Sequence, residues 1–261
     1  MTAFRPRVIP VLLLRNQGLV KTEGFGKQRY IGDPINAVRI FNDLRADELV
    51  FLDILATRER RLISLDFVRN VGEEANMPFA VGGGIRSLEH IRTILSAGAE
   101  KVVINSYAAE NPDFIAEAAD AFGSSTITIC IDVKKKRLGS PRTWTAGGTQ
   151  ATGYAPEEFA RLAQDKGAGE LIVQSIPRDG TMEGYDLDLV ARVSEVVTIP
   201  VVALGGAGGL EDLKQAYTET HASALAAGSI FVYHGSKRGV LINYPDRAEI
   251  EFGHRPATKR R

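Results

Sequence analysis

A glycine-rich segment occurs twice in this chain, and its spacing of 122 residues is maintained beyond the glycines. Segments 78–84 and 200–206 each contain a short apolar run followed by glycines, and Leu88-Glu89 and Leu210-Glu211 follow at the same offset. Self-similarity at a fixed period indicates a fold built from duplicated units. Each unit has the pattern of a strand, a glycine turn and a helix, in which the turn permits close approach of a ligand and free helix N–H groups attract an anion. The repeat therefore predicts a doubled barrel that holds one phosphate at each end of its substrate.

Eight short apolar runs rich in β-branched residues are separated for the most part by amphipathic helical stretches. Strands buried on both faces have this composition, and strand–helix alternation is typical of a parallel sheet. Eight such units predict an α/β protein with a single (β/α)8 TIM barrel, built here as a two-fold half-barrel repeat. No linker interrupts the pattern, so we expect one domain over residues 1–261. The expected strands are 7–14, 49–54, 79–81, 101–104, 126–133, 170–175, 201–204 and 222–227.

Three segments depart from simple alternation. Residues 21–33 form a long glycine-containing stretch that suits a mobile lid over the barrel. Residues 142–152, which contain Gly147-Gly148, have the pattern of a small hairpin. Residues 239–245 are expected to be extended, where an ordinary barrel would place its last helix.

The amino-acid composition of the chain limits the classes of function that it can have. The 32 basic residues balance 32 acidic ones, so there is no broad electrostatic case for nucleic acid or an anionic membrane. The single cysteine, Cys130, lies in an apolar run and is expected to be a buried strand residue rather than a nucleophile. One cysteine excludes an internal disulfide, and no apolar run is long enough to span a membrane, so we expect a cytoplasmic protein. The four histidines lack metal-ligand spacing, and we expect neither a metal nor a cofactor.

Carboxylates close three of the expected strands or follow them directly: Asp53, Asp132 and Asp179. The active sites of such barrels are built at the carboxyl ends of the strands. A carboxyl group there can act as a general acid or base if its surroundings tune its pKa. Each of the three could equally be a helix cap or a salt-bridged loop acid.

The candidate phosphate ligands lie at the same strand ends in both halves of the chain. A pair of glycines alone is more often only a turn, but two pairs at matched strand ends are stronger evidence for anion sites. The candidates are Gly83, Gly84, Asn105 and Ser106 in the first half, and Gly180, Gly205, Gly206, Gly228 and Ser229 in the second. Lys21, Asp53 and Asp179 complete the set of candidate substrate-binding residues.

Four segments closely resemble HisF, the cyclase subunit of imidazole glycerol phosphate synthase: 47–54, 81–85, 101–105 and 175–181. The similarity runs from about Arg7 to Ala227. The resemblance implies a (β/α)8 barrel with two phosphate sites that forms a heterodimer with a HisH-type glutaminase. It further implies that the glutaminase docks at the barrel bottom and that ammonia passes up through the barrel to the substrate.

The resemblance also implies acid–base work by two aspartates, one on strand 1 and one on strand 5. Asp132 matches the aspartate of strand 5. Leu13 stands at the position of the other aspartate, within Val11-Leu12-Leu13-Leu14-Arg15. Loss of a positioned acid–base group typically costs roughly 10²–10⁴ in rate. The chain is therefore expected to lack half of the cyclase machinery.

A ring of charged residues at the barrel bottom, thought to gate ammonia in the family, maps onto Arg7, Glu48, Lys101 and Glu170. All four positions carry the residue type that the resemblance implies. Glu100 is expected beside them at the glutaminase interface. The ring favours a retained ammonia supply.

Segments 8–14, 30–37 and 241–245 are similar to a branch of HisF-like paralogues found with sugar-modification enzymes. That branch is thought to supply ammonia to a separate sugar amidotransferase in surface polysaccharide synthesis. Our leading interpretation is such a subunit, which conveys ammonia from a glutaminase for sugar amidation. The alternative is a genuine histidine-pathway cyclase that tolerates Leu13, while a stand-alone sugar-phosphate isomerase and a non-catalytic scaffold are further possibilities.

Overall fold

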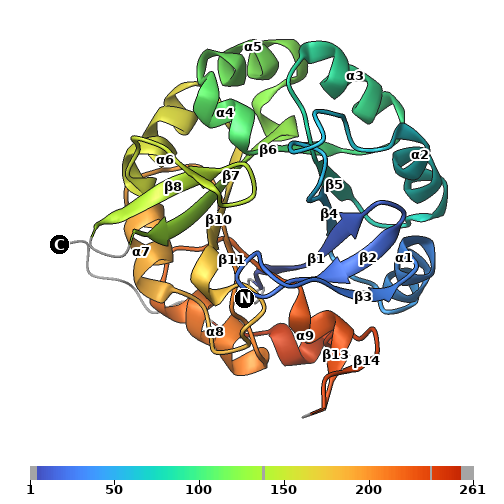
Figure 1. Ribbon diagram of the computed structural model, residues 1–261. Helices are drawn as coiled ribbons and strands as arrows, with labels where there is room; N and C mark the ends of the chain where they lie inside the picture. The colour runs from blue at the N-terminus through green and yellow to red at the C-terminus, as the bar shows by residue number, and fades with distance from the viewer. Residues whose placement is uncertain (1–4, 137–138, 236, 254–261) are drawn as a thin grey trace.

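The structure is a computed structural model that describes residues 5–136, 139–235 and 237–253. In this part of the chain eight parallel strands form a closed barrel with helices around it (Figure 1). The barrel closes because β7 pairs with β10 and β12 pairs with β1. All eight predicted strands are confirmed, with ends that differ by at most two residues. In order around the barrel they are β1 (Arg7–Arg15), β4 (Leu49–Asp53), β5 (Phe79–Gly82), β6 (Lys101–Ile104), β7 (Ile127–Lys135), β10 (Glu170–Ser175), β11 (Val201–Leu204) and β12 (Ala224–Ala227).

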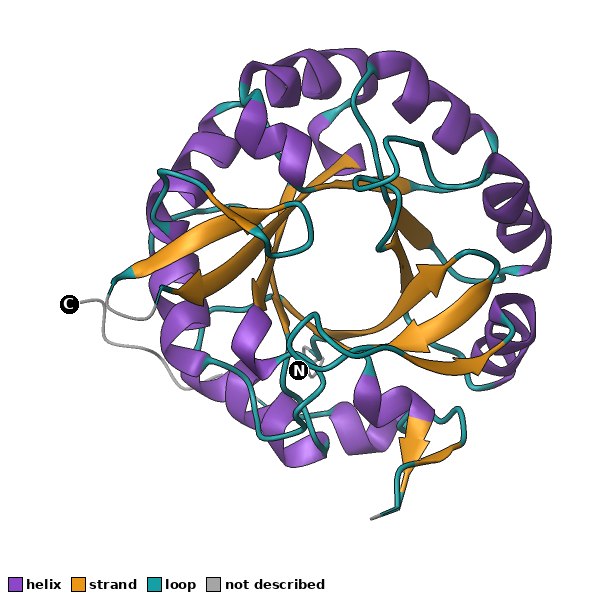
Figure 2. Ribbon diagram, viewed as in Figure 1, coloured by secondary structure: helices purple, strands orange, loops and turns teal. Residues whose placement is uncertain are grey.

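Helices surround the strands on the outside of the barrel (Figure 2). Local chemistry fixes where several of them begin: Asp33 accepts a hydrogen bond from the backbone N–H of Asn36 at 2.8 Å, and Pro34 occupies the first turn of its helix. The α-helices are α1 (Pro34–Asp43), α2 (Leu65–Glu74), α3 (Leu88–Ser96), α4 (Ser106–Glu110), α5 (Asp113–Phe122), α6 (Pro156–Asp165), α7 (Leu187–Glu195), α8 (Leu210–Glu219) and α9 (Ser229–Val232). Short 3₁₀ turns cover Ser124–Thr126, Ile176–Arg178 and Arg247–Ile250.

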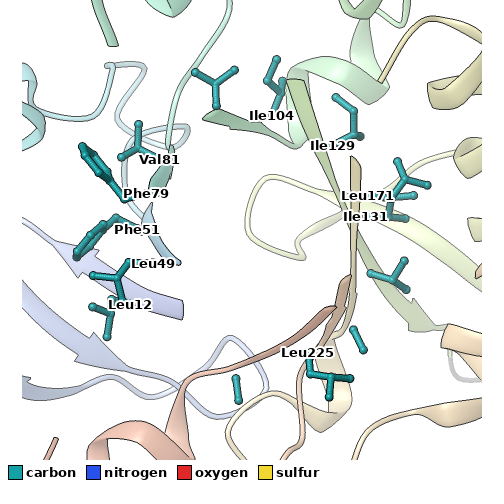
Figure 3. Close-up of a cluster of buried hydrophobic side chains, with 14 of the residues drawn as sticks. Leu12, Leu49, Phe51, Phe79, Val81, Ile104, Ile129, Ile131, Leu171 and Leu225 are labelled. Atoms are coloured by element: carbon teal, nitrogen blue, oxygen red, sulfur yellow. The ribbon is translucent and has the colours of Figure 1, made fainter. Parts of the chain in front are cut away.

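Alternation along the strands divides the apolar side chains into two layers. The larger layer points outward and packs between the strands and the helices; Figure 3 labels members of it on strands around the barrel, such as Phe51, Ile129 and Leu171. The smaller layer fills the barrel interior. Its members include Ile9, Val50, Ala80, Val103, Cys130, Ile172, Val202, Ala224 and Ala226. Cys130 is buried in this layer, as predicted.

The stretch at 21–33 differs from the predicted lid. β2 (Gly18–Lys21) pairs antiparallel with β1, and β3 (Arg29–Gly32) pairs with β2, so only residues 22–28 remain as a connecting turn. The prediction failed because these strands are short and rich in glycine and charged residues, which obscures the strand pattern. This extension continues from the carboxyl end of β1.

The other two irregular segments agree with prediction. β8 (Pro141–Thr145) and β9 (Gln150–Ala151) form the expected hairpin, and β8 also pairs antiparallel with the end of β7. After α9, β13 (Tyr233–His234) pairs with β14 (Gly239–Val240), and the chain continues extended instead of forming a last long helix. The sequence thus gives the correct location for each departure from regular alternation.

Backbone conformation and crowding require glycine at both repeated turns. All four glycines have positive φ values, a region that other residues rarely occupy. A Cβ at Gly84 would lie 1.8 Å from the carbonyl oxygen of Arg61, and one at Gly206 would lie 2.1 Å from that of Gly184. In each half, therefore, the loop after one strand packs directly on the glycine turn after the next strand.

We expect Gly84→Ala to lower the free energy of unfolding by about 3 kcal/mol, because it adds backbone strain and a clash that each cost about 1–3 kcal/mol. Gly123→Ala is the matched control: its φ is also positive, at 85°, but no atom lies within 4 Å of the added Cβ. This control is expected to lose only about 1–2 kcal/mol. Urea denaturation measures both values. Equal losses would contradict the role assigned to close packing at Gly84.

Candidate functional site

A cavity of about 280 Å³ opens at the carboxyl ends of the first-half strands and of β7. Both glycines of the first repeat line it, as do Asn105, Ser106 and Asp132. A much smaller cavity of about 20 Å³ lies beside it under the second repeat. Leu13 and Gln174 line both cavities and therefore mark the boundary between them.

Asp132 lies on the inner face of β7 and is almost fully buried, with 6% of its surface exposed. Burial raises the pKa of this carboxyl group to about 7, and the nearby Asp179 carboxylate acts in the same direction. The thiol of Cys130 donates a hydrogen bond to Asp132 Oδ1 at 3.5 Å, which partly opposes the rise. A carboxyl group in this state can take or give a proton near neutral pH.

Leu13 lies on the inner face of β1 and lines the same cavity as Asp132. It pairs in register with Leu52 of β4 and with Val20 of β2, so apolar side chains surround it. No carboxylate comes from β1 to meet Asp132. The wall of the cavity on this side is an isobutyl group that cannot transfer a proton.

The polar residues at the end of β6 already have partners. Asn105 donates through Nδ2 to the carbonyl oxygen of Cys130 at 3.0 Å. The hydroxyl of Ser106 donates to Asn105 Oδ1 at 3.2 Å and accepts from the backbone N–H of Ala146 at 2.9 Å. These bonds join the β8–β9 hairpin to the cavity wall and leave the glycine turn as the open face of the first predicted phosphate site.

The second predicted phosphate site brings its sequence-predicted residues together around Lys21. The small cavity is lined by Lys21, Asp179, Gly180, Gly205, Gly206, Gly228 and Ser229. Lys21 Nζ approaches Gly228 so closely that a Cβ there would lie 1.9 Å away. Desolvation lowers the pKa of this buried ammonium, and the Asp179 carboxylate partly compensates. A buried cation beside a glycine turn suits an anionic ligand.

Asp53 and Asp179 line the cavities but are also structural acids. The carboxylate of Asp53 accepts two hydrogen bonds from Arg61, at 2.5 and 3.2 Å, and two more from backbone N–H groups. Asp179 accepts a hydrogen bond from the Thr22 hydroxyl at 2.7 Å. Of the three predicted strand-end acids, only Asp132 is left without an ion-pair or hydroxyl partner among the described residues.

Sequence reasoning missed several side chains that line the larger cavity. Gln174 shares the inner face of β10 with Glu170, and alternation along that strand would have identified it. Arg58 and Arg86 come from the loops after β4 and β5 and bring positive charge to the cavity. No sequence pattern marks these loop arginines, because their positions depend on how the loops fold back over the strand ends.

At the opposite end of the barrel the four predicted ring residues form a closed cycle of ion pairs. Arg7 bonds to the carboxylates of both Glu48 and Glu170, and Lys101 Nζ lies 3.1 Å from each of the same two. Desolvation opposes the charge on Arg7, but the two carboxylates outweigh it and raise the pKa of Arg7 above its usual value. The cycle therefore closes the amino-terminal end of the barrel. Glu100 is exposed and makes no side-chain bond within the described residues, so it lies outside this cycle.

The extended C-terminal segment reaches the same end of the barrel through Tyr244. Its hydroxyl donates to the carbonyl oxygen of Val8 at 2.8 Å and accepts from the backbone N–H of Asp47 at 3.2 Å. Val8 follows Arg7 in the chain and Asp47 precedes Glu48. One tyrosine thus bridges the two backbone segments that carry one edge of the ring.

The closed barrel defines the chain as a (β/α)8 barrel, and buried Asp132 and the two cavities lie at the carboxyl ends of its strands, where such barrels build their active sites. No group of three or more His, Cys, Asp or Glu side chains in residues 5–136, 139–235 and 237–253 is arranged to hold a metal ion. None of the helices in those ranges has the length and apolar character that a membrane crossing requires.

Comparison with known proteins identifies the family. The family model described as histidine biosynthesis protein matches residues 7–237. A protein of Leptospira interrogans, provisionally named imidazole glycerol phosphate synthase subunit HisF, is 45% identical, with 95% of this chain and 98% of that protein covered. A Pseudomonas aeruginosa protein, provisionally named subunit hisF2, is 44% identical, with 95% and 99% covered.

A protein of Alkaliphilus metalliredigens, named imidazole glycerol phosphate synthase subunit HisF, is 44% identical over 87% of this chain and 90% of its own length. The chain therefore belongs to the HisF family of imidazole glycerol phosphate synthase subunits. The resemblance inferred from the four sequence segments is confirmed at the level of the family.

Asp132 is expected to give the folded protein a distinct pH dependence. Its pKa is about 7 when folded against an ordinary value of 3.8, so between these pH values the native state holds a proton that the unfolded chain has lost. The free energy of unfolding should therefore fall as pH rises from about 4 to 7, by up to about 4 kcal/mol. Asp132→Asn should remove this fall and be the more stable protein above pH 7.

Urea denaturation across this pH range makes the measurement. Asp66→Asn is the control, because the side chain of Asp66 is 87% exposed and the substitution should preserve the wild-type pH dependence. Parallel curves for wild type and Asp132→Asn would contradict the raised pKa.

Proposed function

We propose that this protein is a HisF-like subunit that receives ammonia from a HisH-like glutaminase and passes it through the barrel, for amidation of a sugar in surface glycan synthesis. The observation that carries the proposal is the contrast between the two ends of the barrel. The complete ring of ion pairs is present at one end. At the other end Asp132 faces the cavity without an acidic partner from β1, where Leu13 stands.

The ring has the properties of a gate for a small neutral molecule. Its two cations and two anions pair fully with one another, so the opening is closed at rest without net charge. Removing one partner would leave an uncompensated buried charge, which is strongly destabilising. A temporary shift of the flexible Lys101 chain would open the ring while Arg7 keeps both carboxylates paired. Above the ring the interior is largely apolar, which suits ammonia better than ammonium.

The cavity supports a reduced chemical role for this subunit. Acid–base catalysis with one donor and one acceptor needs two groups with separate positions and pKa values. Asp132 supplies one such group, whereas the side chain of Leu13 cannot supply the other. Delivery of ammonia to a second enzyme requires only that the carboxyl end of the barrel release it. Support for a sugar as the final acceptor comes from the similarity of segments 8–14, 30–37 and 241–245 to the glycan-associated paralogues.

The alternative function is that of a genuine cyclase in histidine biosynthesis. Its support is the pair of glycine turns with the buried Lys21, an arrangement suited to a substrate with a phosphate at each end. A cyclase of this kind would have to obtain its second proton-transfer group from elsewhere, and Glu23 on the turn after β2 is the nearest acid along that loop.

A cyclase assay separates the two functions. With the histidine-pathway ribulosyl intermediate and a high ammonium concentration, we expect turnover roughly 10²–10⁴ below that of an authentic cyclase, because one acid–base group is missing. Leu13→Asp should raise turnover, since it places a carboxyl group on the wall that faces the same cavity as Asp132. Leu52→Asp is the matched control: Leu52 is the register partner of Leu13 and lines the same cavity.

Turnover of the wild-type protein near that of an authentic cyclase would overturn the leading proposal in favour of the alternative. Equal gains from Leu13→Asp and Leu52→Asp would show that an added acid acts nonspecifically. If the Leu13→Asp variant stays inactive, other groups needed for cyclase catalysis are also missing from the cavity.

The partner proposal is tested by charge reversal in the ring. Arg7→Glu with Lys101→Glu places four like charges at the barrel bottom, so we expect co-purification with a HisH-like glutaminase and stimulation of its glutamine hydrolysis to fail. Arg69→Glu with Arg92→Glu changes the net charge equally at exposed helix ion pairs and should leave both properties intact.

Circular dichroism establishes that each variant is folded before binding is measured. If the folded ring variant still binds and activates the glutaminase as the wild type does, the interface carried over from the family is wrong.

A further inference from the structure

The hydroxyl of Thr128 is buried inside the barrel without a partner. Only 1% of the residue is exposed, and Oγ1 makes no hydrogen bond. Buried polar atoms are nearly always hydrogen-bonded, because an unsatisfied one keeps the full cost of leaving water. A threonine in this state is therefore informative: valine has the same shape and would avoid that cost.

Alternation along β7 places Thr128 on the inner face of the barrel. Ile127, Ile129 and Ile131 belong to the layer that packs against the helices, whereas Cys130 belongs to the interior cluster. Because side chains of a strand alternate between its faces, Thr128 points inward with Cys130 and Asp132. The unpaired hydroxyl thus faces the barrel interior.

Thr128 is the first of three inner-face side chains of β7 that extend from the ring to the larger cavity. It is the register partner of Glu170, a ring member, across the β7–β10 pairing. Two residues further along the same face is Cys130, and two beyond that is Asp132, which lines the larger cavity. One strand therefore carries a hydroxyl, a thiol and a carboxyl group in sequence from the ring to the cavity.

Between the ring and the level of Asp132, the described residues of the other strands place no comparable polar group in the barrel interior. In the described residues, the other inner-face side chains between the ring and the upper level belong to the apolar interior cluster, among them Ile9, Val11, Val50, Ala80, Val103, Ile172, Val202, Ala224 and Ala226. Between the ring and the level of Asp132, a small polar molecule inside the described barrel can thus exchange hydrogen bonds with side chains only along β7.

Ammonia matches this line of groups chemically. A threonine hydroxyl has one donor and two acceptor sites, and neutral ammonia can likewise donate and accept. Burial raises the pKa of Cys130 well above its usual value, so the second group stays a thiol that can donate, as it does to Asp132. A neutral hydroxyl and thiol can receive ammonia without holding it as a buried ion pair.

We propose that the inner face of β7 is the path of ammonia through the barrel, with the Thr128 hydroxyl, beside the ring, as the first uncharged group to which ammonia can hydrogen-bond. The inference rests on the proposed ammonia-conducting function, and it assigns the route of ammonia to particular side chains. Thr128 is a positioning residue in this scheme: it holds ammonia in the lumen and takes no part in bond making.

The direct test uses the full-length protein labelled at threonine methyl groups and followed by NMR during titration with ammonium chloride. At a pH where much of the added salt is neutral ammonia, the Thr128 methyl signal should shift and saturate. At acidic pH, where ammonium dominates, it should not. Thr143 is an internal control, because its buried Oγ1 also lacks a partner but belongs to β8, outside the barrel. Its methyl signal should not respond at either pH.

The matched variants are Thr128→Val and Thr143→Val, which remove the two unpartnered hydroxyls without changing shape. With valine methyl labels, neither substituted position should respond to ammonia. Both variants should be as stable as the wild type or more so, since each loses an unsatisfied buried group. Normal folding of these variants keeps the comparison interpretable.

The functional test uses the complex with the glutaminase and the sugar amidotransferase that the proposed function requires as the acceptor of ammonia, with glutamine labelled with ¹⁵N in its amide and unlabelled ammonium in solution. For Thr128→Val we expect the proportion of labelled nitrogen to unlabelled nitrogen in the aminated product to fall about 2- to 10-fold, the effect of one lost hydrogen bond. Thr143→Val should match the wild type, and Thr128→Ser, which keeps the hydroxyl, should restore delivery. Glutamine hydrolysis itself should be unchanged in all three.

A Thr128 methyl signal that does not respond to neutral ammonia, or Thr128→Val delivering nitrogen as well as Thr143→Val, would overturn the proposed path. Failure of the wild-type protein to bind or activate a glutaminase would instead count against the proposed function. A saturable response at Thr128 in that case would retain the ammonia site within the barrel.

Discussion

The pairing of β7 with β10 is the interaction on which the rest of the molecule depends, because it sets which side chains of two neighbouring barrel strands reach the two openings. Its six residue pairs fix which side chains face inward on both strands. Glu170 is thereby directed to the lower opening, and Asp132 and Gln174 to the upper one. A shift of one residue in this register would place Ile131 toward the cavity and Asp132 among the helices, so strand register and site geometry are a single constraint.

Much of this architecture is readable from sequence, because it follows from local periodicity. The strand at 127–135 is evident from its alternating β-branched residues. The glycine turns are evident from the repeat, because other residues cannot adopt their backbone conformation without strain. What the sequence does not disclose depends on long-range packing. β2 is stabilised by pairing with β1, and β3 by pairing with β2. Arg58 and Arg86 reach the cavity only because their loops fold inward, and the Asp53 carboxylate is paired with Arg61.

The two openings of the barrel have separate physical requirements, which explains how one can change while the other is kept. The ring at the lower opening is a set of four charges in which each depends on the others, so single substitutions there are costly. Leu13 at the upper opening extends an interior that is already apolar, because it is in register with Val20 and Leu52. A leucine at this position is thus compatible with the fold, whereas removal of one ring member leaves its partners with unpaired charge.

The hydrogen bond from Tyr244 to Val8 joins residues 236 positions apart, near the two ends of the described chain. During synthesis the ribosome releases the chain from its amino terminus, so β1 must wait until the 236 positions up to Tyr244 have been made before this contact exists. β12, the second neighbour of β1 in the barrel, also emerges late. The Arg7–Glu48 edge therefore lies at a seam that is completed late in synthesis, and a nascent barrel would remain open at its charged end until Tyr244 has emerged.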